Sequence, residues 1–205
     1  MQFLSKINSK KFKLYLWKIE ESESELKKEI IINDSLRKRL NSLKSLDHRK
    51  GVLSIQQLIR IANIKENELN YDLHGAPILK SGKHISISHS KYFSGIIISD
   101  FNIGIDIEFF RDKILKIGPK FTNEDENYAL GKIEDLTFIW TAKEAIYKAF
   151  RTPGISFSDQ IHVGQLKKYE KKQLARVDFN NQFKLYDLTS FKLNSSIITI
   201  ALEKI

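Results

Sequence analysis

The stretch Ile103-Gly104-Ile105-Asp106-Ile107-Glu108 predicts a β-strand with a chemically active face. Side chains alternate along a strand, so the three isoleucines point into a core while Gly104, Asp106 and Glu108 share the opposite face. The two carboxylates then lie roughly 7 Å apart along the chain, within reach of one hard cation. Gly104 is predicted to leave room for a ligand beside the backbone. The simpler interpretation is an ordinary half-buried strand with a polar outer face.

A second motif lies in a predicted helix over residues 135–150, and reads Trp140-Thr141-Ala142-Lys143-Glu144-Ala145-Ile146-Tyr147-Lys148. In a helix Trp140, Glu144 and Lys148 are spaced at i, i+4 and i+8, so they lie roughly on one face. A surface Glu–Lys pair beside a core tryptophan would give the same pattern.

The third motif is Ile85-Ser86-Ile87-Ser88-His89-Ser90, a predicted strand that ends in polar residues. A histidine just past a strand end can donate a hydrogen bond to a phosphate, although an ordinary loop histidine is the plainer interpretation. No GxSxG pattern supports a nucleophilic serine, and neither HExxH nor GxxxxGK[ST] is present. Serine hydrolase, zinc protease and P-loop functions therefore lack support.

The order of the remaining elements predicts the fold class. Each half of the chain reads as a strand, then helices, then several strands, with a hairpin expected between residues 95–99 and 103–108. We expect an α+β protein with two similar α/β halves, residues 1–102 and 103–205, packed as a pseudo-dimer. Each half should have a mainly antiparallel sheet and a long helix.

Composition limits the class of protein. The 205 residues are 41% hydrophobic, enough to bury a core, and include no cysteine, so disulfides and thiolate metal sites are excluded. Apolar runs are too short to cross a membrane, and no secretory segment opens the chain, so a cytoplasmic protein is expected. The net charge of +9 attracts anions. A solvated lysine-rich surface would also explain that charge.

A nucleic-acid-binding protein is a rival interpretation of the same charge. It predicts clustered lysine and arginine with aromatic platforms, whereas the lysines here are dispersed. The grouped carboxylates would also repel phosphate unless a metal were present. We therefore expect no nucleic-acid partner.

The three motifs together resemble the signature of the 4′-phosphopantetheinyl transferase superfamily, in its single-chain, pseudo-dimeric form. The resemblance rests on their order, on the 17-residue step from His89 to Asp106 and on the Trp-x-x-Lys-Glu-Ala-x-x-Lys helix. It covers roughly residues 46–157. Weaker matches are His48-Arg49 and His74-Gly75-Ala76-Pro77.

The resemblance implies transfer of the 4′-phosphopantetheine arm of coenzyme A to a serine of an acyl or peptidyl carrier protein, with release of adenosine 3′,5′-bisphosphate. It implies that Asp106, Glu108 and Glu144 hold Mg²⁺ in the C-terminal half, which also carries the catalytic helix. The N-terminal half would contact the nucleotide end. A catalytically weak member that only binds coenzyme A or the carrier is the alternative.

The resemblance also implies roles for single residues. The catalytic residues would be Glu144, Lys148 and His89, with Glu144 either only holding the metal or also taking the proton of the serine. The residues expected to bind coenzyme A are Arg49, Ser88, His89, Lys143 and Lys148.

One position departs from the family pattern. Ala76 stands where the family has a lysine, and Lys80 or Lys83 is considered as its replacement. Carrier proteins of this kind are acidic, so the net charge of +9 would steer them to the enzyme. A monomer with internal pseudo-twofold symmetry is expected.

Overall fold

The computed structural model describes residues 3–165 and 173–204, and it shows a mixed α+β fold in which every strand pairing is antiparallel. The four-stranded sheet has the order β1 (Phe3–Asn8), β2 (Phe12–Lys18), β6 (Phe93–Ser99), β5 (His84–His89). The five-stranded sheet has the order β7 (Ile103–Phe109), β11 (Ser196–Glu203), β10 (Gln182–Leu193), β9 (Gln173–Phe179), β8 (Ile161–His162). A small sheet pairs β3 (Leu69–Tyr71) with β4 (Pro77–Leu79).

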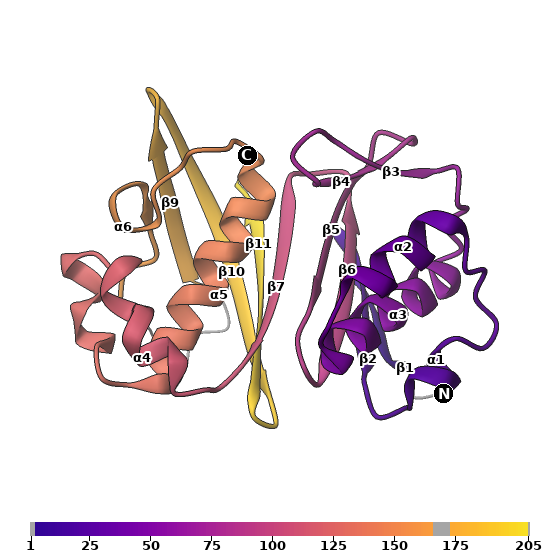
Figure 1. The fold of residues 1–205 in the computed structure, drawn as a ribbon. Helices are drawn as coiled ribbons and strands as arrows, with labels where there is room; N and C mark the ends of the chain where they lie inside the picture. The colour runs from indigo at the N-terminus through magenta and orange to yellow at the C-terminus, as the bar shows by residue number, and fades with distance from the viewer. Residues whose placement is uncertain (1–2, 166–172, 205) are drawn as a thin grey trace.

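One long helix packs on each main sheet. The helix α3 (Leu46–Ile61) lies on the four-stranded sheet and α5 (Ile133–Phe150) on the five-stranded sheet. The shorter helices are α1 (Glu23–Leu26), α2 (Asp34–Ser42), α4 (Lys113–Ile117) and α6 (Phe157–Gln160), with 3₁₀ turns η1 (Gly118–Lys120) and η2 (Glu124–Ala129). Figure 1 shows the two halves side by side with β5 and β7 adjacent at their junction. The predicted pair of α/β halves is confirmed.

Three hydrophobic cores hold this arrangement together. One lies between α5 and the five-stranded sheet and includes Ala142, Ile146 and Tyr186. A second lies between α3 and the four-stranded sheet and includes Trp17, Leu53 and Leu58. The third joins the two main sheets and includes Leu14, Ile97, Ile105 and Ile200. Because this third core crosses the halves, their relative position is fixed by apolar burial.

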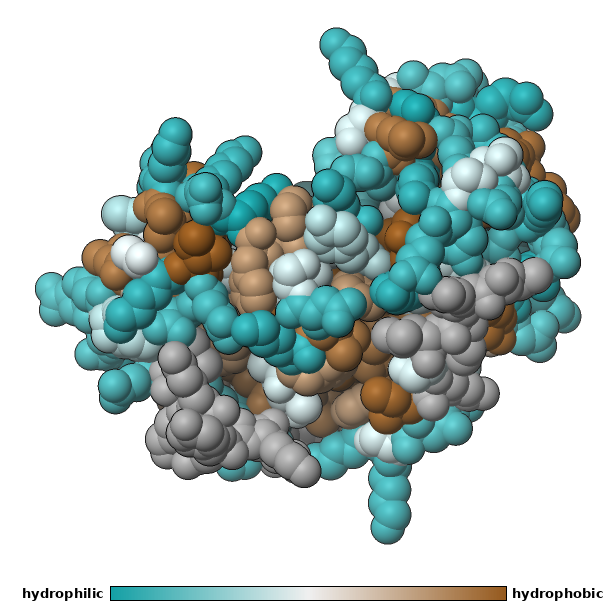
Figure 2. All heavy atoms as spheres, turned by 90° about the horizontal axis from the view of Figure 1, so that it is seen from below, coloured by the Kyte–Doolittle hydropathy of each residue, from teal (hydrophilic) through white to brown (hydrophobic). Residues whose placement is uncertain are grey.

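The molecular surface agrees with the charged composition. Viewed from below, Figure 2 shows hydrophilic side chains over most of the face and hydrophobic ones gathered between its two lobes. Among the described helices, none is long and apolar enough to cross a membrane.

The hairpin predicted between residues 95–99 and 103–108 is wrong. The strand β6 pairs with β2 and β5, whereas β7 pairs with β11 in the other sheet. The turn at 100–102 therefore carries the chain from one sheet to the other. The physical reason is burial, because Ile103 and Ile105 pack in the core shared with the four-stranded sheet while their strand pairs with β11 from the C-terminal end of the chain.

The expected role of Gly104 is also wrong. A Cβ at this position would lie 1.9 Å from the carbonyl oxygen of Ala145, so the glycine makes room for the backbone of α5 and not for a ligand. This close approach sets the distance between β7 and the helix that carries Glu144 and Lys148.

Candidate functional site

A cleft lies at the junction of the halves, with walls from α3, β5, β7 and α5. Its main cavity has a volume of about 320 Å³ and is lined by polar residues that include Arg39, His89, Asp106, Glu108 and Lys148. A second cavity of about 220 Å³ continues from it, since both are lined by Gly75, Pro77, Ile87 and Lys148. The strand and helix motifs of the sequence therefore meet at one place.

Asp106 is buried and held by two hydrogen bonds. It is only 5% exposed, and its Oδ1 accepts hydrogen bonds from Lys148 Nζ at 2.7 Å and Ser88 Oγ at 2.9 Å. Its Oδ2 is buried and has no partner among the described residues. A buried carboxylate oxygen without a partner is costly, so this atom is available to a ligand that supplies positive charge or a donor.

Serine hydroxyls join the two halves beside Asp106. The Oγ atoms of Ser86 and Ser88 accept hydrogen bonds from the backbone N–H groups of Ile105 and Ile107, at 3.1 and 3.2 Å. Alternation along β5 directs both serines toward β7. Ser88, predicted to bind coenzyme A, thus lines the cleft but also holds Asp106 in place.

The carboxylates of the cleft repel one another. Burial raises the pKa of Glu144 to about 7, and the negative charge of Asp106 adds to the rise. Burial, and then the same charge, also raises the pKa of Glu108. Lys148 opposes both shifts without cancelling them. Arg111, which pairs with Glu108 Oε2 at 3.2 Å, also lowers the pKa of Glu108 without cancelling its rise. A cation held between these carboxylates would lower their pKa values, so their raised pKa values favour a bound cation.

The predicted magnesium site is not assembled in this conformation. Within residues 3–165 and 173–204, no three Asp, Glu or His side chains stand close enough together to hold one ion. The donor set nevertheless fits a hard divalent cation, since it offers three carboxylates and the unpartnered Oδ2 of Asp106. Glu108 and Glu144 have to turn toward Asp106 before one ion can touch all three.

His89 lies on the N-terminal side of the cleft against α3. A Cβ on Gly51 would come within 2.4 Å of His89 Nδ1, so only glycine leaves space for the imidazole there. Burial and, next, the positive charge of Arg39 lower the pKa of His89 to about 4. A neutral imidazole at pH 7 carries one N–H donor, enough for one hydrogen bond to a phosphate.

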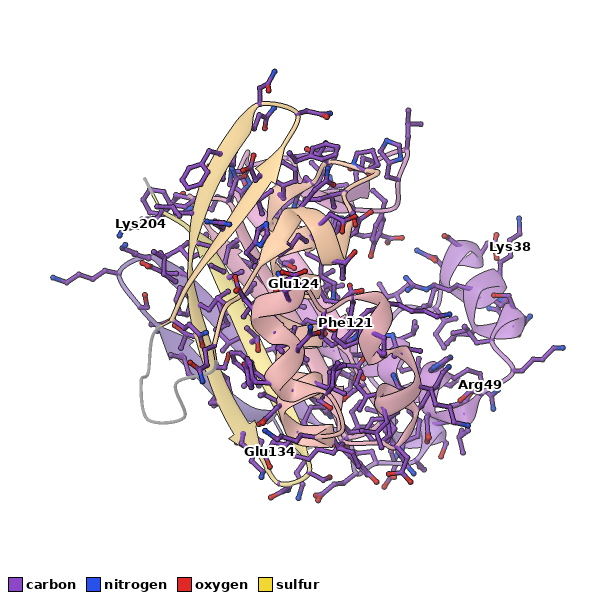
Figure 3. The ribbon with its side chains drawn as sticks, turned by 90° about the vertical axis from the view of Figure 1, so that its left-hand side faces the viewer. Lys38, Arg49, Phe121, Glu124, Glu134 and Lys204 are labelled. Atoms are coloured by element: carbon purple, nitrogen blue, oxygen red, sulfur yellow. The ribbon has the colours of Figure 1, made fainter. Side chains whose placement is uncertain are left out.

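Arg49, predicted to bind coenzyme A, is not brought to the cleft. Its Nε pairs with Glu23 Oε2 at 2.9 Å, and its Nη1 donates to the carbonyls of Leu43 and Lys44. It lines a separate cavity of about 380 Å³ among the helices of the N-terminal half. Figure 3 shows it there, apart from Phe121 of the C-terminal half. The loop before α3 supplies the carbonyls that hold its guanidinium.

Lys143, predicted to bind coenzyme A, is not brought to the cleft. Its side chain is fully buried, where Nζ pairs with Glu126 Oε2 at 2.6 Å and donates to the carbonyls of Phe121 and Phe157. Successive helical residues point about 100° apart. When Glu144 faces the cleft, Lys143 consequently faces the C-terminal core.

Two lysines considered as replacements for the family lysine at Ala76 also lie elsewhere. Lys83 pairs with Asp100 at 2.8 Å and lines a separate cavity with Lys13 and Ala62. Lys80 is exposed and lines neither cavity of the cleft.

Sequence reasoning missed Arg39. This residue projects from α2 into the main cavity and faces His89, whose pKa its charge lowers. It stands in a run of basic residues, Arg37-Lys38-Arg39, that reads as an ordinary solvated helix. Only the packing of α2 beside α3 distinguishes it from its neighbours.

Comparison with known proteins indicates which family the chain resembles. Residues 102–200 match the model of the 4′-phosphopantetheinyl transferase superfamily. The chain is also similar to the 4′-phosphopantetheinyl transferase gsp of Aneurinibacillus migulanus, with 28% identity over 170 residues that cover 76% of this chain and 72% of the relative. The matched region includes β7, α5 and their carboxylates. Both matches support the 4′-phosphopantetheinyl transferase superfamily as the family of this chain.

Proposed function

We propose that this enzyme uses Mg²⁺ to transfer the 4′-phosphopantetheine arm of coenzyme A to a serine of an acyl or peptidyl carrier protein. The leaving group is adenosine 3′,5′-bisphosphate. The observation that carries the proposal is Asp106, a buried carboxylate with an open Oδ2, in a cleft shared with Glu108 and Lys148. Glu144 lines neither cavity, but its charge interacts with all three of these side chains. Three carboxylates alone would repel a pyrophosphate, so the arrangement requires a cation to bind one.

Asp106, Glu108 and Glu144 would hold the metal. When bound, the ion would neutralise the charge that develops on the phosphoryl oxygens and on the leaving group. Lys148 adds a second positive charge from the next turn of α5, and its ammonium already lies 2.7 Å from Asp106. We assign to Lys148 a contact with the phosphate that becomes attached to the carrier.

Glu144 is the candidate general base for the carrier serine. A base works best when its pKa lies near the working pH, and burial raises the pKa of Glu144 to about 7. The same carboxylate would also face the metal, so holding the ion is its alternative role.

The N-terminal half would contact the phosphates at the nucleotide end. Neutral His89 offers one N–H donor, and Arg39 offers a planar fork suited to phosphate oxygens. No described hydrogen bond or ion pair to the protein engages the Arg39 side chain, whereas the guanidinium of Arg49 is already held. We therefore assign to Arg39 the phosphate contact first predicted for Arg49.

The substitution Arg39→Ala should raise the KM for coenzyme A about tenfold, with kcat nearly unchanged, because a charge-assisted hydrogen bond of this kind contributes roughly 1.5–3 kcal/mol. Steady-state kinetics with varied coenzyme A measures the effect. Lys38→Ala is the control, since it removes one positive charge from the same helix at a side chain that projects outward in Figure 3. Equal KM values for coenzyme A in the two variants would show that Arg39 does not bind coenzyme A.

The partner would be an acidic carrier protein, attracted by the net charge of +9. The pseudo-dimeric arrangement supplies both walls of the cleft from one chain, so a monomer suffices. We keep the cytoplasm as its proposed location. The alternative function is a catalytically weak member that binds coenzyme A or the carrier without transfer.

Mass spectrometry of apo carrier proteins, incubated with coenzyme A, Mg²⁺ and the enzyme, tests the proposal. We expect the carrier to gain one phosphopantetheine arm, and the gain to disappear with a chelator or with Glu144→Gln under saturating Mg²⁺. Coenzyme A binding by calorimetry without any mass gain would favour the binding-only alternative. A full rate for Glu144→Gln would exclude Glu144 from both of its proposed roles.

A further inference from the structure

Helix α5 ends at a residue in an unfavourable backbone conformation. Arg151 is its C-cap, with φ 59° and ψ 18°, and its N–H donates to the carbonyl of Tyr147 at 3.0 Å. Glycine is the usual residue in this left-handed position, because a side chain there costs roughly 1 kcal/mol. An arginine at such a position implies that interactions of its side chain offset the conformational cost.

The Arg151 side chain crosses from the C-terminal half to the N-terminal half. Its Nη2 donates to the carbonyl of Pro77 at 3.0 Å and to that of Ile85 at 2.8 Å. These two bonds use both N–H groups of Nη2, and neither Nε nor Nη1 has a hydrogen-bond partner among the described residues. The guanidinium therefore ties the start of β4 to the catalytic helix while keeping donors for another molecule.

Arg151 lines the second cavity of the cleft, the one of about 220 Å³. This cavity joins the main cavity at Lys148, next to the proposed phosphate site. Four residues with ring side chains contribute to its lining, the aromatic His74 and Tyr147 and the prolines Pro77 and Pro153. A planar heteroaromatic group fits such walls, and a guanidinium stacks on or donates to a base more readily than an ammonium does.

The loop opposite Arg151 is ordered from within. Asp72 Oδ1 accepts hydrogen bonds from the N–H groups of His74 and Ala76, both at 2.9 Å. Ala76, where the family has a lysine, lines the same cavity as Arg151. The loop thus lacks the family lysine at Ala76, whereas Arg151 at the end of α5 brings a positive charge to the same cavity.

We infer that Arg151 is a binding and specificity residue for the nucleoside end of coenzyme A, supplying from α5 the positive charge that Ala76 lacks. The inference rests on the proposed function, because it takes coenzyme A as the ligand of the cleft. It assigns the base to the ring-lined cavity and leaves the phosphopantetheine arm outside it.

The substitution Arg151→Gly isolates the side chain, because glycine accepts the left-handed backbone without strain. We expect the KM for coenzyme A to rise about tenfold, the loss of one charge-assisted contact, with kcat within about twofold of the wild type. By calorimetry, adenosine 3′,5′-bisphosphate should bind about tenfold more weakly, and 4′-phosphopantetheine should bind as before. Arg151→Lys should fall between the two.

Asn63→Gly is the matched control, since Asn63 is also left-handed, with φ 57°, but lies outside both cavities. Unchanged binding of adenosine 3′,5′-bisphosphate by Arg151→Gly would overturn the inference. Equal weakening of 4′-phosphopantetheine would overturn the assignment to the nucleoside end. If Arg151→Gly fails to fold, the binding of adenosine 3′,5′-bisphosphate and 4′-phosphopantetheine is measured on Arg151→Lys and judged by the same two criteria. A wild-type protein that binds no coenzyme A would instead refute the proposed function.

Discussion

The substitution Asp106→Asn is expected to lower the rate of phosphopantetheine transfer about 1000-fold without unfolding the protein, the scale found when one preorganised electrostatic group is lost from an active site. Asparagine has nearly the same shape, and its Oδ1 can still accept from Lys148 and Ser88. The substitution changes the function of Oδ2, because this unpartnered oxygen becomes an NH₂ group that cannot ligate a cation. The substitution therefore separates the chemistry of Asp106 from its packing.

Initial rates of carrier modification measure this effect, and thermal unfolding with and without Mg²⁺ provides a second readout. The wild type should gain stability on adding Mg²⁺, since a ligand that binds only the folded state raises the melting temperature, and Asp106→Asn should not. Without metal the variant should differ little in stability, because it removes the repulsion of Glu108 and Glu144 but also the ion pair with Lys148. The control is Asp112→Asn, at an exposed position. A variant that keeps a tenth of the wild-type rate contradicts the assignment.

The substitution Lys143→Met is expected to reduce the free energy of unfolding by about 3–5 kcal/mol, because it leaves Glu126 as a buried carboxylate without its counter-ion. Both side chains are fully buried. The ammonium has three N–H donors and uses them on Glu126 and on two backbone carbonyls. Glu126 in turn accepts from the N–H groups of Asn123 and Val163, so the pair joins η2, α5 and the segment after β8.

Urea unfolding followed by circular dichroism measures the loss. The double variant Lys143→Met with Glu126→Gln should recover much of it, because a neutral amide costs less to bury and still accepts from Val163. Lys116→Met, on the exposed side of α4, is the control and should change stability by less than about 0.5 kcal/mol. A loss below about 1 kcal/mol for Lys143→Met alone would show that the pair contributes little.

Local patterns predicted what depends on local geometry. Alternation along 103–108 correctly gave a strand with isoleucines on one face, and the long helix ends at Phe150 as expected. The hairpin failed because a three-residue turn says nothing about which strand will pair with β7. That partner, β11, lies about ninety residues further along the chain. Pairing at such a separation is decided by burial of the isoleucines against the other sheet.

The sequence by itself indicated the family and determined the α+β halves and the carboxylate face of β7, because these follow from two- and 3.6-residue periods and from the spacing of motifs. Only the tertiary structure decided which basic side chains reach the cleft. It turned Lys143 into the C-terminal core and held Arg49 against Glu23. It also placed Arg39 and Arg151 in the two cavities. The physical reason is that a long cationic side chain goes where distant segments provide carbonyls, carboxylates or open space, and none of these is visible from its neighbours in sequence.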